Sequence, residues 1–434
     1  MIAIAPALEE ATRDDDLSAG IARVRSLYMH VPFCERRCEY CDFASVAGLA
    51  GHEQYVAALR GEIAVMTRAL PGLVLDTVFV GGGTPSLLPA ELLAAILDEV
   101  RKGAALSPGA EVTMEANPSS TDAARARAWR DAGVNRVSLG VQSLHPPTLR
   151  FLGRVHDADR AVRAVAEVRE AGVARVSADL IHAVPTLDDD AWADTVERVL
   201  ALGCGHLSAY ELTIEQGTPL HRDVERGLIH PVDDETALRQ HWMVVDAARE
   251  AGLEQYEVSN FARPDEGCRH NLAYWDNAYY LAVGVGAHGH VPRGVAAALG
   301  HESRRDDSLA VRYRHDRHPA TYVRRAAHGD GAWATIAEAE EIDAATAQAE
   351  RIMVGLRRIA AGVELAGDPL VAEAEALRDT GLLELFRRGD SLRARVTPRG
   401  QDVLNVVALR LVAAAERVPA GPNPRRSRGT LGTR

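Results

Sequence analysis

A repeated alternation of short apolar strands with amphipathic helices most constrains the fold of this 434-residue chain. Helical patterns, such as those over residues 91–102 and 158–172, separate successive strands. The six predicted strands are SLYMHV (26–31), TVFV (77–80), EVTMEA (111–116), RVSLGV (136–141), RVSADLI (175–181) and HLSAYEL (206–212). Strands joined by helices pair in parallel through right-handed crossovers, so this order predicts an α/β fold, either an open sheet or a barrel. The distinctive loops follow the carboxyl ends of the strands, where such folds place their functional sites.

Composition divides the chain into a leader, a strand–helix region, a connector, a small terminal domain and a tail. These segments are residues 1–24, 25–260, 261–334, 335–416 and 417–434. The acidic leader and the tail, which is rich in Pro, Gly and Arg, are predicted to be disordered. In the terminal domain, a helical pattern from Ile336 onward precedes a hairpin at Gly389–Asp390, and a further helix starts at Pro398. This order is typical of a winged-helix-like domain.

The charge pattern excludes several classes of partner and location. A net charge of −12 argues against general nucleic-acid binding, and only Arg425, Arg426 and Arg428 form a basic run that a DNA-binding regulator could use. The chain has no run of about 18 uninterrupted apolar residues, so no membrane span is predicted, although peripheral association with a membrane stays open. The acidic start lacks the positive charge of a secretory signal, so a cytoplasmic location is predicted.

Three of the five cysteines, Cys34, Cys38 and Cys41, lie within eight residues. In the cytoplasm, where thiols stay reduced, such a cluster favours metal binding over a disulfide. A structural zinc site needs four ligands, and no histidine at zinc-finger spacing or second cysteine pair lies nearby. Three thiolates fit a [4Fe–4S] cluster with one iron left open. The alternative is three unrelated buried cysteines.

The run FVGGGTPS (79–86) leads from a predicted strand into three glycines. Glycines let a backbone approach a ligand closely, although a run after a strand can equally be a tight turn. Together with CxxxCxxC, the run is similar to the segments of radical S-adenosylmethionine (SAM) proteins that hold the cluster and the methionyl group of SAM.

The chain resembles the branch of the radical-SAM family that contains oxygen-independent coproporphyrinogen III oxidases and related heme chaperones. The matching runs, in order over about residues 25–290, are LYMHVPFCERRCEYCDF, VGGGTPS, EANP, GVQS, LGRVH, SADLI and YEVSNFA. The C-terminal part resembles the small terminal domain of that family. The resemblance implies a partial (β/α)6 barrel of radical-SAM type with a small C-terminal winged-helix-like domain.

The resemblance also implies roles for individual residues. Cys34, Cys38 and Cys41 would hold the [4Fe–4S] cluster, and the amine and carboxylate of SAM would chelate its open iron. The residues implied to bind SAM are Tyr28, Tyr40, Gly82, Gly83, Thr84, Glu115, Gln142, Arg154 and Asp179. Of these, Gln142, Arg154 and Asp179 match positions that contact a second SAM in the oxidase. Ala183 departs from the family pattern, which has glycine there, and this weakens the expectation for the loop after Asp179.

Two features favour the heme-chaperone branch. Phe43 stands where the oxidase has a fourth cysteine, and CRHNLAYW (268–275) contains HNxxYW, which resembles the heme-binding motif of the chaperones. The motif residues implied to bind heme are His270, Asn271, Tyr274 and Trp275. An imidazole can ligate heme iron, and aromatic faces can pack on a porphyrin. We expect His270 to emerge from a loop near the open mouth of the sheet.

The predicted function is that of a heme chaperone that binds heme b, a [4Fe–4S] cluster and SAM and passes heme to an acceptor protein such as a respiratory cytochrome. The alternative is a coproporphyrinogen III oxidase that decarboxylates propionates through a 5′-deoxyadenosyl radical, and Phe43 argues against it. The alternative for HNxxYW is a buried, hydrogen-bonded histidine among core aromatics. Cys268, His288 and His290 are reserve heme ligands.

Overall fold

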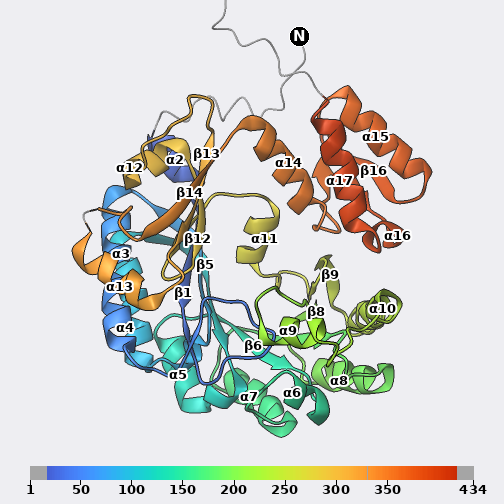
Figure 1. Ribbon diagram of the computed structural model, residues 1–434, viewed down its shortest axis with the longest axis horizontal. Coiled ribbons are helices and arrows are strands. Elements are labelled where there is room, and N and C mark those ends of the chain that lie inside the picture. The colour runs from blue at the N-terminus through green and yellow to red at the C-terminus, as the bar shows by residue number, and fades with distance from the viewer. Residues whose placement is uncertain (1–16, 330, 418–434) are drawn as a thin grey trace, which may run out of the picture. The chain divides into compact units, whose positions relative to one another are not determined.

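The computed structural model describes residues 17–329 and 331–417, and the chain divides after Asp343 into two units. In the larger unit, six parallel strands form the centre of a twelve-stranded sheet. These strands are β1 (Ser26–Val31), β4 (Val74–Gly82), β5 (Ala105–Ala116), β6 (Arg136–Gln142), β7 (Arg175–His182) and β8 (His206–Glu211). They pair in chain order, and all six strands expected from the sequence are confirmed. The fold is a partial (β/α)6 barrel (Figure 1).

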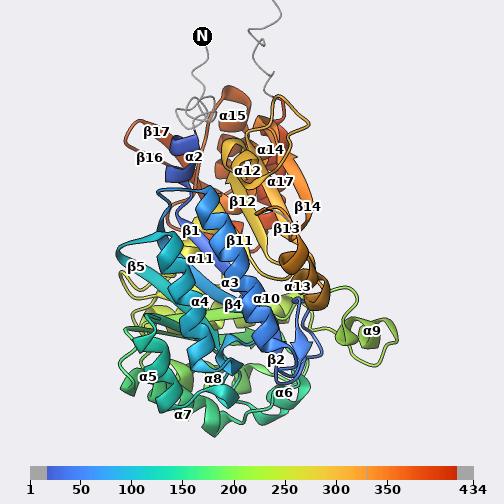
Figure 2. The ribbon, with the colours of Figure 1, turned by 90° about the vertical axis from the view of Figure 1, so that its left-hand side faces the viewer.

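Helices connect the parallel strands and cover the outer face of the sheet (Figures 1 and 2). The main ones are α3 (His52–Ala69), α4 (Ala90–Gly103), α5 (Ala123–Asp131), α7 (Ala158–Glu170), α8 (Asp189–Ala201) and α10 (Asp234–Glu250). Four of them begin at an aspartate whose carboxylate accepts a hydrogen bond from the backbone N–H three residues later: Asp122, Asp157, Asp188 and Asp233. Such caps satisfy N–H groups that a helix start leaves free, so they fix where each helix begins. The apolar faces of these helices and of the strands form one continuous buried core.

Shorter elements complete the barrel region. They are α2 (Leu17–Arg23), β2 (Phe33–Cys34), β3 (Val46–Ala47), the 3₁₀ turns η1 (Pro85–Leu87) and η2 (Pro118–Ser120), α6 (Pro146–Phe151) and α9 (Pro219–Glu225). Helix α2 lies inside the segment predicted to be a disordered leader, so that expectation is wrong for residues 17–23; residues 1–16 lie outside the described residues.

Residues 254–342, which include the connector predicted over residues 261–334, extend the sheet on both sides. On one side, β9 (Glu254–Glu257) and β10 (Asn260–Ala262) pair antiparallel beside β8. On the other side, β11 (Tyr280–Val283) runs parallel to β1, and β12 (His288–Pro292), β13 (Ala310–His315) and β14 (Ile336–Ile342) continue antiparallel. Helices α11 (Arg269–Trp275), α12 (Arg293–Leu299) and α13 (Pro319–His328) lie between these strands in sequence.

Strand β14 corrects the predicted domain boundary at residue 335 and the helical pattern predicted from Ile336. Glu338 and Glu340 lie on one face of the strand and form ion pairs with Arg314 and Arg312 of β13. Alternation with a period of two is a strand pattern, and the cross-strand charge pairs support it. The larger unit therefore ends after Asp343.

The smaller unit has the helix and hairpin order predicted for a winged-helix-like domain. Its elements are α14 (Ala344–Gly355), β15 (Val363–Glu364), α15 (Asp368–Asp379), β16 (Leu383–Arg388), β17 (Ser391–Val396), α16 (Pro398–Gln401) and α17 (Leu404–Ala415). The hairpin of β16 and β17 turns at Gly389, whose φ of +60° favours glycine, and β15 adds the third strand. Residues 418–434 of the predicted tail lie outside the described residues. No helix among the described residues is long and apolar enough to cross a membrane.

Candidate functional site

A cavity of about 560 Å³ runs through the inside of the partial barrel. Along β6, the alternate residues Arg136, Ser138, Gly140 and Gln142 all line it, because every second side chain of a strand faces the same side. The cavity therefore follows β6 from its first residue to its last, a distance of about 20 Å. At the carboxyl end of β6 the cavity reaches the cysteine loop, residues 33–47. Cys34, Cys38 and Cys41 of this loop line the cavity.

The cysteine loop is closed by β2 and β3, which pair in parallel at its two ends. Within the loop, the N–H of Cys41 donates to the carbonyl of Cys38 over 3.2 Å, and the N–H of Gly48 donates to the carbonyl of Cys34 over 2.8 Å. All three cysteines are free thiols, and burial raises the pKa of Cys34 and of Cys41. Nη1 of Arg154 donates to Sγ of Cys38 over 3.6 Å, so a guanidinium faces the site where thiolates are expected.

The donor set of this loop fits an iron–sulfur cluster better than a single metal ion. Three thiols from one loop line the same cavity. A closed zinc site would need four ligands around one point. The three cysteines can anchor a cluster with one iron left open to another ligand.

The glycine segment at the end of β4 packs against the cysteine loop. A Cβ atom on Gly83 would lie 2.8 Å from the carbonyl oxygens of Pro32 and Phe33, so only glycine fits there. Gly82 has a φ of +116°, and its N–H donates to Oε2 of Glu115 over 3.0 Å. Gly82, Gly83 and Thr84 all line the cavity. The glycines thus let β4 and the cysteine loop meet at the cavity wall.

Two partly buried carboxyl groups, Glu115 and Asp179, line the cavity from β5 and β7. Burial and, to a smaller extent, the charge of Asp179 raise the pKa of Glu115 to about 7, although the N–H of Gly82 opposes the shift. Asp179 accepts hydrogen bonds from the hydroxyl groups of Ser138 and Ser208 at 2.9 and 2.8 Å, although burial still raises its pKa. These groups can act as acceptors for the polar parts of a bound cofactor.

Gln142 and Arg154 lie near Gly140 at the carboxyl end of β6. Nη2 of Arg154 donates to the carbonyl of Gly140 over 3.1 Å, and Gln142 lies in the left-handed region with a φ of +65°. A non-glycine residue in this region is uncommon and is often found at binding sites. Ala183 also has a positive φ, of +56°, which explains why glycine suits that position.

The two tyrosines expected beside the cofactor differ in position. Tyr40 lines the cavity, and burial raises its pKa. The hydroxyl group of Tyr28 is hydrogen-bonded to Nδ1 of His30 over 3.0 Å, and its ring stacks on Phe79, which lines the cavity. Tyr28 itself is not part of the cavity lining.

The structure corrects the prediction that His270 lies in an open loop, because HNxxYW is part of helix α11. His270 is 1% exposed, and its Nδ1 and Nε2 atoms are hydrogen-bonded to the hydroxyl groups of Thr77 and Tyr274 at 2.8 and 2.9 Å. Its ring stacks on Phe79 at 5.2 Å, and burial lowers its pKa to about 4. Both ring nitrogens are therefore engaged, as in the alternative of a buried, hydrogen-bonded histidine.

The rest of the motif and the reserve ligands lie in different surroundings. Asn271 lines the cavity, so α11 borders the same space as the cysteines. Cys268 is fully buried, with Sγ 3.5 Å from Oε1 of Glu111, and His290 is also buried. His288 is the one exposed residue among the three reserve ligands.

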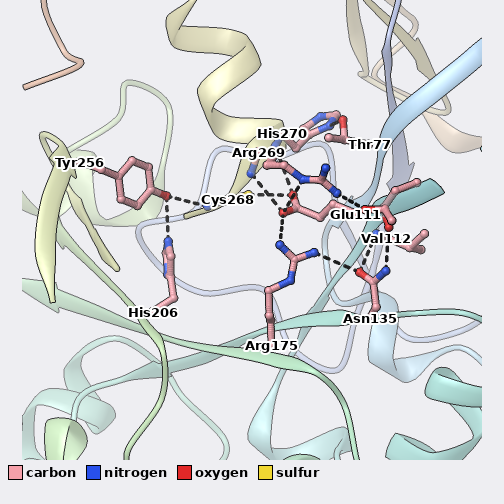
Figure 3. Close-up of polar contacts among 12 residues, drawn as sticks. Thr77, Glu111, Val112, Asn135, Arg175, His206, Tyr256, Cys268, Arg269 and His270 are labelled. Atoms are coloured by element: carbon pink, nitrogen blue, oxygen red, sulfur yellow. Dashed lines mark hydrogen bonds and ion pairs between the residues drawn. The ribbon is translucent and has the colours of Figure 1, made fainter. Parts of the chain in front are cut away.

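Sequence reasoning missed the buried charge network beneath α11, shown in Figure 3. Glu111 of β5 has no exposed surface, and it accepts hydrogen bonds from the N–H groups of Arg269 and His270 and from Nη1 of Arg175. It thereby fixes the start of α11 inside the barrel. The glutamate lies on the same face of β5 as Glu115, four residues earlier, and that alternation was the signal that could have identified it.

Comparisons with known proteins agree with this geometry. Residues 28–199 match the family model described as the Radical SAM superfamily. The chain is 38% identical over 393 residues to the heme chaperone HemW of Mycobacterium tuberculosis strain H37Rv. The aligned region covers 89% of this chain and 94% of that protein. It is 39% identical to HemW of Escherichia coli K12 over 61% of this chain and 70% of that protein.

A solved structure supports the fold. Coproporphyrinogen III oxidase (HemN) from Escherichia coli, a radical-SAM enzyme, superposes with a TM-score of 0.74 over 94% of this chain and 93% of that chain. The two sequences are 18% identical, so this similarity bears on the fold alone. The cysteine loop, the barrel cavity and the extent of the match to the mycobacterial chaperone together place this chain in the HemW family of radical-SAM proteins.

Proposed function

We propose that this protein is a heme chaperone, which binds heme, a [4Fe–4S] cluster and SAM and transfers the heme to an acceptor protein. One observation carries the proposal: Asn271 of the HNxxYW helix and the three cysteines of the cluster motif line a single cavity. A heme site and a cluster site would then share one cavity. The names of the mycobacterial and Escherichia coli relatives support this reading.

In this proposal Cys34, Cys38 and Cys41 anchor the cluster, and Arg154 offsets part of its negative charge. Tyr40, the backbone at Gly82 and Gly83, Thr84, and the polar side chains around the cavity hold SAM. The polar residues are Glu115, Gln142, Arg154 and Asp179. The cluster and SAM together supply radical chemistry through reductive cleavage of the sulfonium group. The chain contributes binding, orientation and exclusion of water.

His270 is the proposed heme ligand, and its surroundings set a condition on binding. Both ring nitrogens are hydrogen-bonded and the side chain is buried, so ligation requires Nε2 to leave the hydroxyl group of Tyr274 or Nδ1 to leave that of Thr77. Because burial lowers its pKa to about 4, the imidazole is neutral at pH 7 and keeps a lone pair for a metal. Tyr274 and Trp275 supply aromatic surface for the porphyrin.

Phe43 lies at the cavity lining with 64% of its surface exposed. Phe43 has an apolar ring where the oxidase has a thiol. The ring can pack on a porphyrin but cannot perform the chemistry of a thiol. The proposed acceptor is a heme protein such as a respiratory cytochrome.

A transfer experiment tests the proposal. Cluster-reconstituted protein is loaded anaerobically with hemin, freed of excess hemin and mixed with a heme-free b-type cytochrome. We expect heme to appear in the cytochrome faster than from serum albumin loaded to the same extent. Failure to retain hemin, or delivery no faster than from albumin, would contradict the proposal.

A further inference from the structure

Arg136, the first residue of β6, carries a buried cation that the proposed site does not yet use. It is 2% exposed and lines the inner end of the cavity. Within the described part of the chain its guanidinium group makes no hydrogen bond or ion pair, and its Nε atom is buried without a partner. A guanidinium has five N–H donors and stays charged at any physiological pH. Glu111 and Asp179 lie within electrostatic range and raise the pKa of Arg136, but its buried N–H donors lack an acceptor, which is costly.

The acidic groups nearest to Arg136 are engaged by other residues. Glu111 is 3.1 Å from Nη1 of Arg175 and also accepts hydrogen bonds from backbone N–H groups at the start of α11. Asp179 accepts hydrogen bonds from the hydroxyl groups of three serines, Ser138, Ser177 and Ser208. Neither carboxylate bonds to Arg136, so its donors remain directed at the cavity.

The position of Arg136 separates it from the cluster end of the cavity. The guanidinium group of Arg154 donates hydrogen bonds to Sγ of Cys38 and to the carbonyl of Gly140. Gly140 lies four residues after Arg136 along β6. Four residues of a strand span about 13 Å, so Arg136 lies well below the level of the cysteine loop. The carboxylate of SAM, which is expected at the cluster, does not account for a cation at this depth.

The inner end of the cavity also borders the HNxxYW helix. Asn271 and Phe79 line the cavity, and His270 stacks on Phe79. Glu111 accepts the N–H of His270 and also lies within electrostatic range of Arg136. A ligand that contacts the helix from inside the cavity would therefore come near Arg136.

We infer that the inner end of the cavity is a carboxylate-binding subsite in which Arg136 pairs with a propionate of the bound heme; this inference rests on the proposed function. The planar guanidinium matches a carboxylate through two parallel hydrogen bonds, which are strong because both groups are charged. Such a pair would orient the porphyrin inside the barrel.

The wild-type protein tests the inference without any substitution. Hemin and hemin dimethyl ester, whose propionates carry no charge, are titrated anaerobically into cluster-reconstituted protein. We expect hemin to bind at least about tenfold more tightly than the diester, because a hydrogen-bonded charge pair is lost. Equal affinities would overturn the inference while leaving heme binding intact, whereas failure of both compounds to bind would overturn the proposed function itself.

Variants then locate the charge. Arg136→Gln should weaken hemin binding to the level of the diester, and Arg136→Lys should keep part of the difference. Arg198→Gln, which removes an exposed arginine paired with Asp194 on α8, should leave both affinities unchanged. If Arg136→Gln lowers the affinity for SAM and leaves the preference for hemin over the diester intact, the carboxylate belongs to SAM and the inference is wrong. If Arg136→Gln does not fold, Arg136→Lys decides, because a preference for hemin over the diester as large as that of the wild type would contradict pairing through the planar guanidinium.

Discussion

Single cysteines decide whether the chain can hold its cluster. Cys34, Cys38 and Cys41 line the cavity, whereas Cys204 and Cys268 are buried outside its lining. We predict that anaerobic reconstitution gives about four irons and four sulfides per chain, with a thiolate-to-iron absorption that dithionite bleaches. Cys38→Ala should lose nearly all of this iron, because two thiolates are too few to anchor the cluster.

Cys204→Ala is the matched control for the loss of a thiol, and its iron content should equal that of the wild type. The ligand assignment is wrong if Cys204→Ala loses as much iron as Cys38→Ala.

The hydrogen bonds of His270 separate its proposed role as a ligand from a structural one. His270→Ala should weaken hemin binding by at least about tenfold and shift the Soret band, because a metal bond is lost, while the cluster stays intact. Tyr274→Phe keeps the ring and removes the hydroxyl group 2.9 Å from Nε2. It should therefore bind hemin at least as fast as the wild type, as measured by stopped-flow absorption.

His288→Ala and Cys268→Ala serve as comparisons for these heme-binding variants. A Soret band and an affinity that do not change in His270→Ala would exclude this residue as the ligand, and the same titration of the two comparison variants would then identify a substitute. Trp275→Ala should have a smaller effect than His270→Ala, since it removes stacking area and no metal bond.

At the scale of elements, strand prediction succeeded where burial made the sequence pattern strong. The six parallel strands contain short apolar runs between helices, and each was found with its ends within three residues, except that β5 begins six residues earlier than predicted, at Ala105. Strand β14 and helix α11 were missed for different reasons. Glu338 and Glu340 of β14 pair with arginines of β13, and the local sequence does not show this pairing. The start of α11 is held by hydrogen bonds to Glu111, which is remote in sequence.

The corrected domain boundary predicts how two truncated chains behave. A chain that ends after Asp343 keeps β14 and its ion pairs with β13, and it also keeps the hydrogen bond from Thr335 to buried Glu62. It should unfold cooperatively and retain the cluster. A chain that ends at residue 334 exposes the edge of β13 and removes a partner of Glu62, so it should melt at a lower temperature or fail to fold.

Circular dichroism and iron content measured on both truncated chains test this prediction. Equal melting temperatures would show that β14 is not part of the larger folding unit.

The site was less predictable than the fold. The cysteines, the glycines and the HNxxYW residues stand in contiguous motifs, so their proximity in sequence made them visible. Arg136 is the first residue of β6 and Glu111 lies in the middle of β5, and both resemble ordinary polar residues until the sheet buries them. The depth of His270 depended on the helical form of α11, which a seven-residue stretch does not reveal.

At the scale of the whole molecule, buried histidines set the response to acid. Burial lowers the pKa of His30, His156, His270 and His290 to about 4 and that of His182 to about 3. In the unfolded chain a histidine takes up a proton near pH 6.5, so stability that is present above this pH is lost as the pH falls toward 4. Between pH 6.5 and its pKa in the folded chain, each such histidine lowers the free energy of unfolding by at most about 1.4 kcal/mol per pH unit.

The pKa of His315 shifts in the opposite direction. Burial opposes its charge, but Glu62 at 2.6 Å outweighs this and raises its pKa, so its contribution is lost as the pH rises. Burial also lowers the pKa of His206 and His288, so the described histidines with a lowered pKa outnumber His315. The melting temperature should therefore fall steadily between pH 6.5 and 4.5 in calorimetry. A constant melting temperature over this range would contradict the neutral, buried state assigned to these side chains.

Under the proposed function, this barrel carries heme and does not oxidise coproporphyrinogen. The most direct test uses one anaerobic, cluster-reconstituted sample with SAM and a reductant, divided between a hemin titration and an assay with coproporphyrinogen III. We predict saturable binding of one heme per chain and no protoporphyrinogen, because Phe43 stands in place of the fourth cysteine. Conversion of coproporphyrinogen over many turnovers, with no saturable binding of hemin, would contradict the claim.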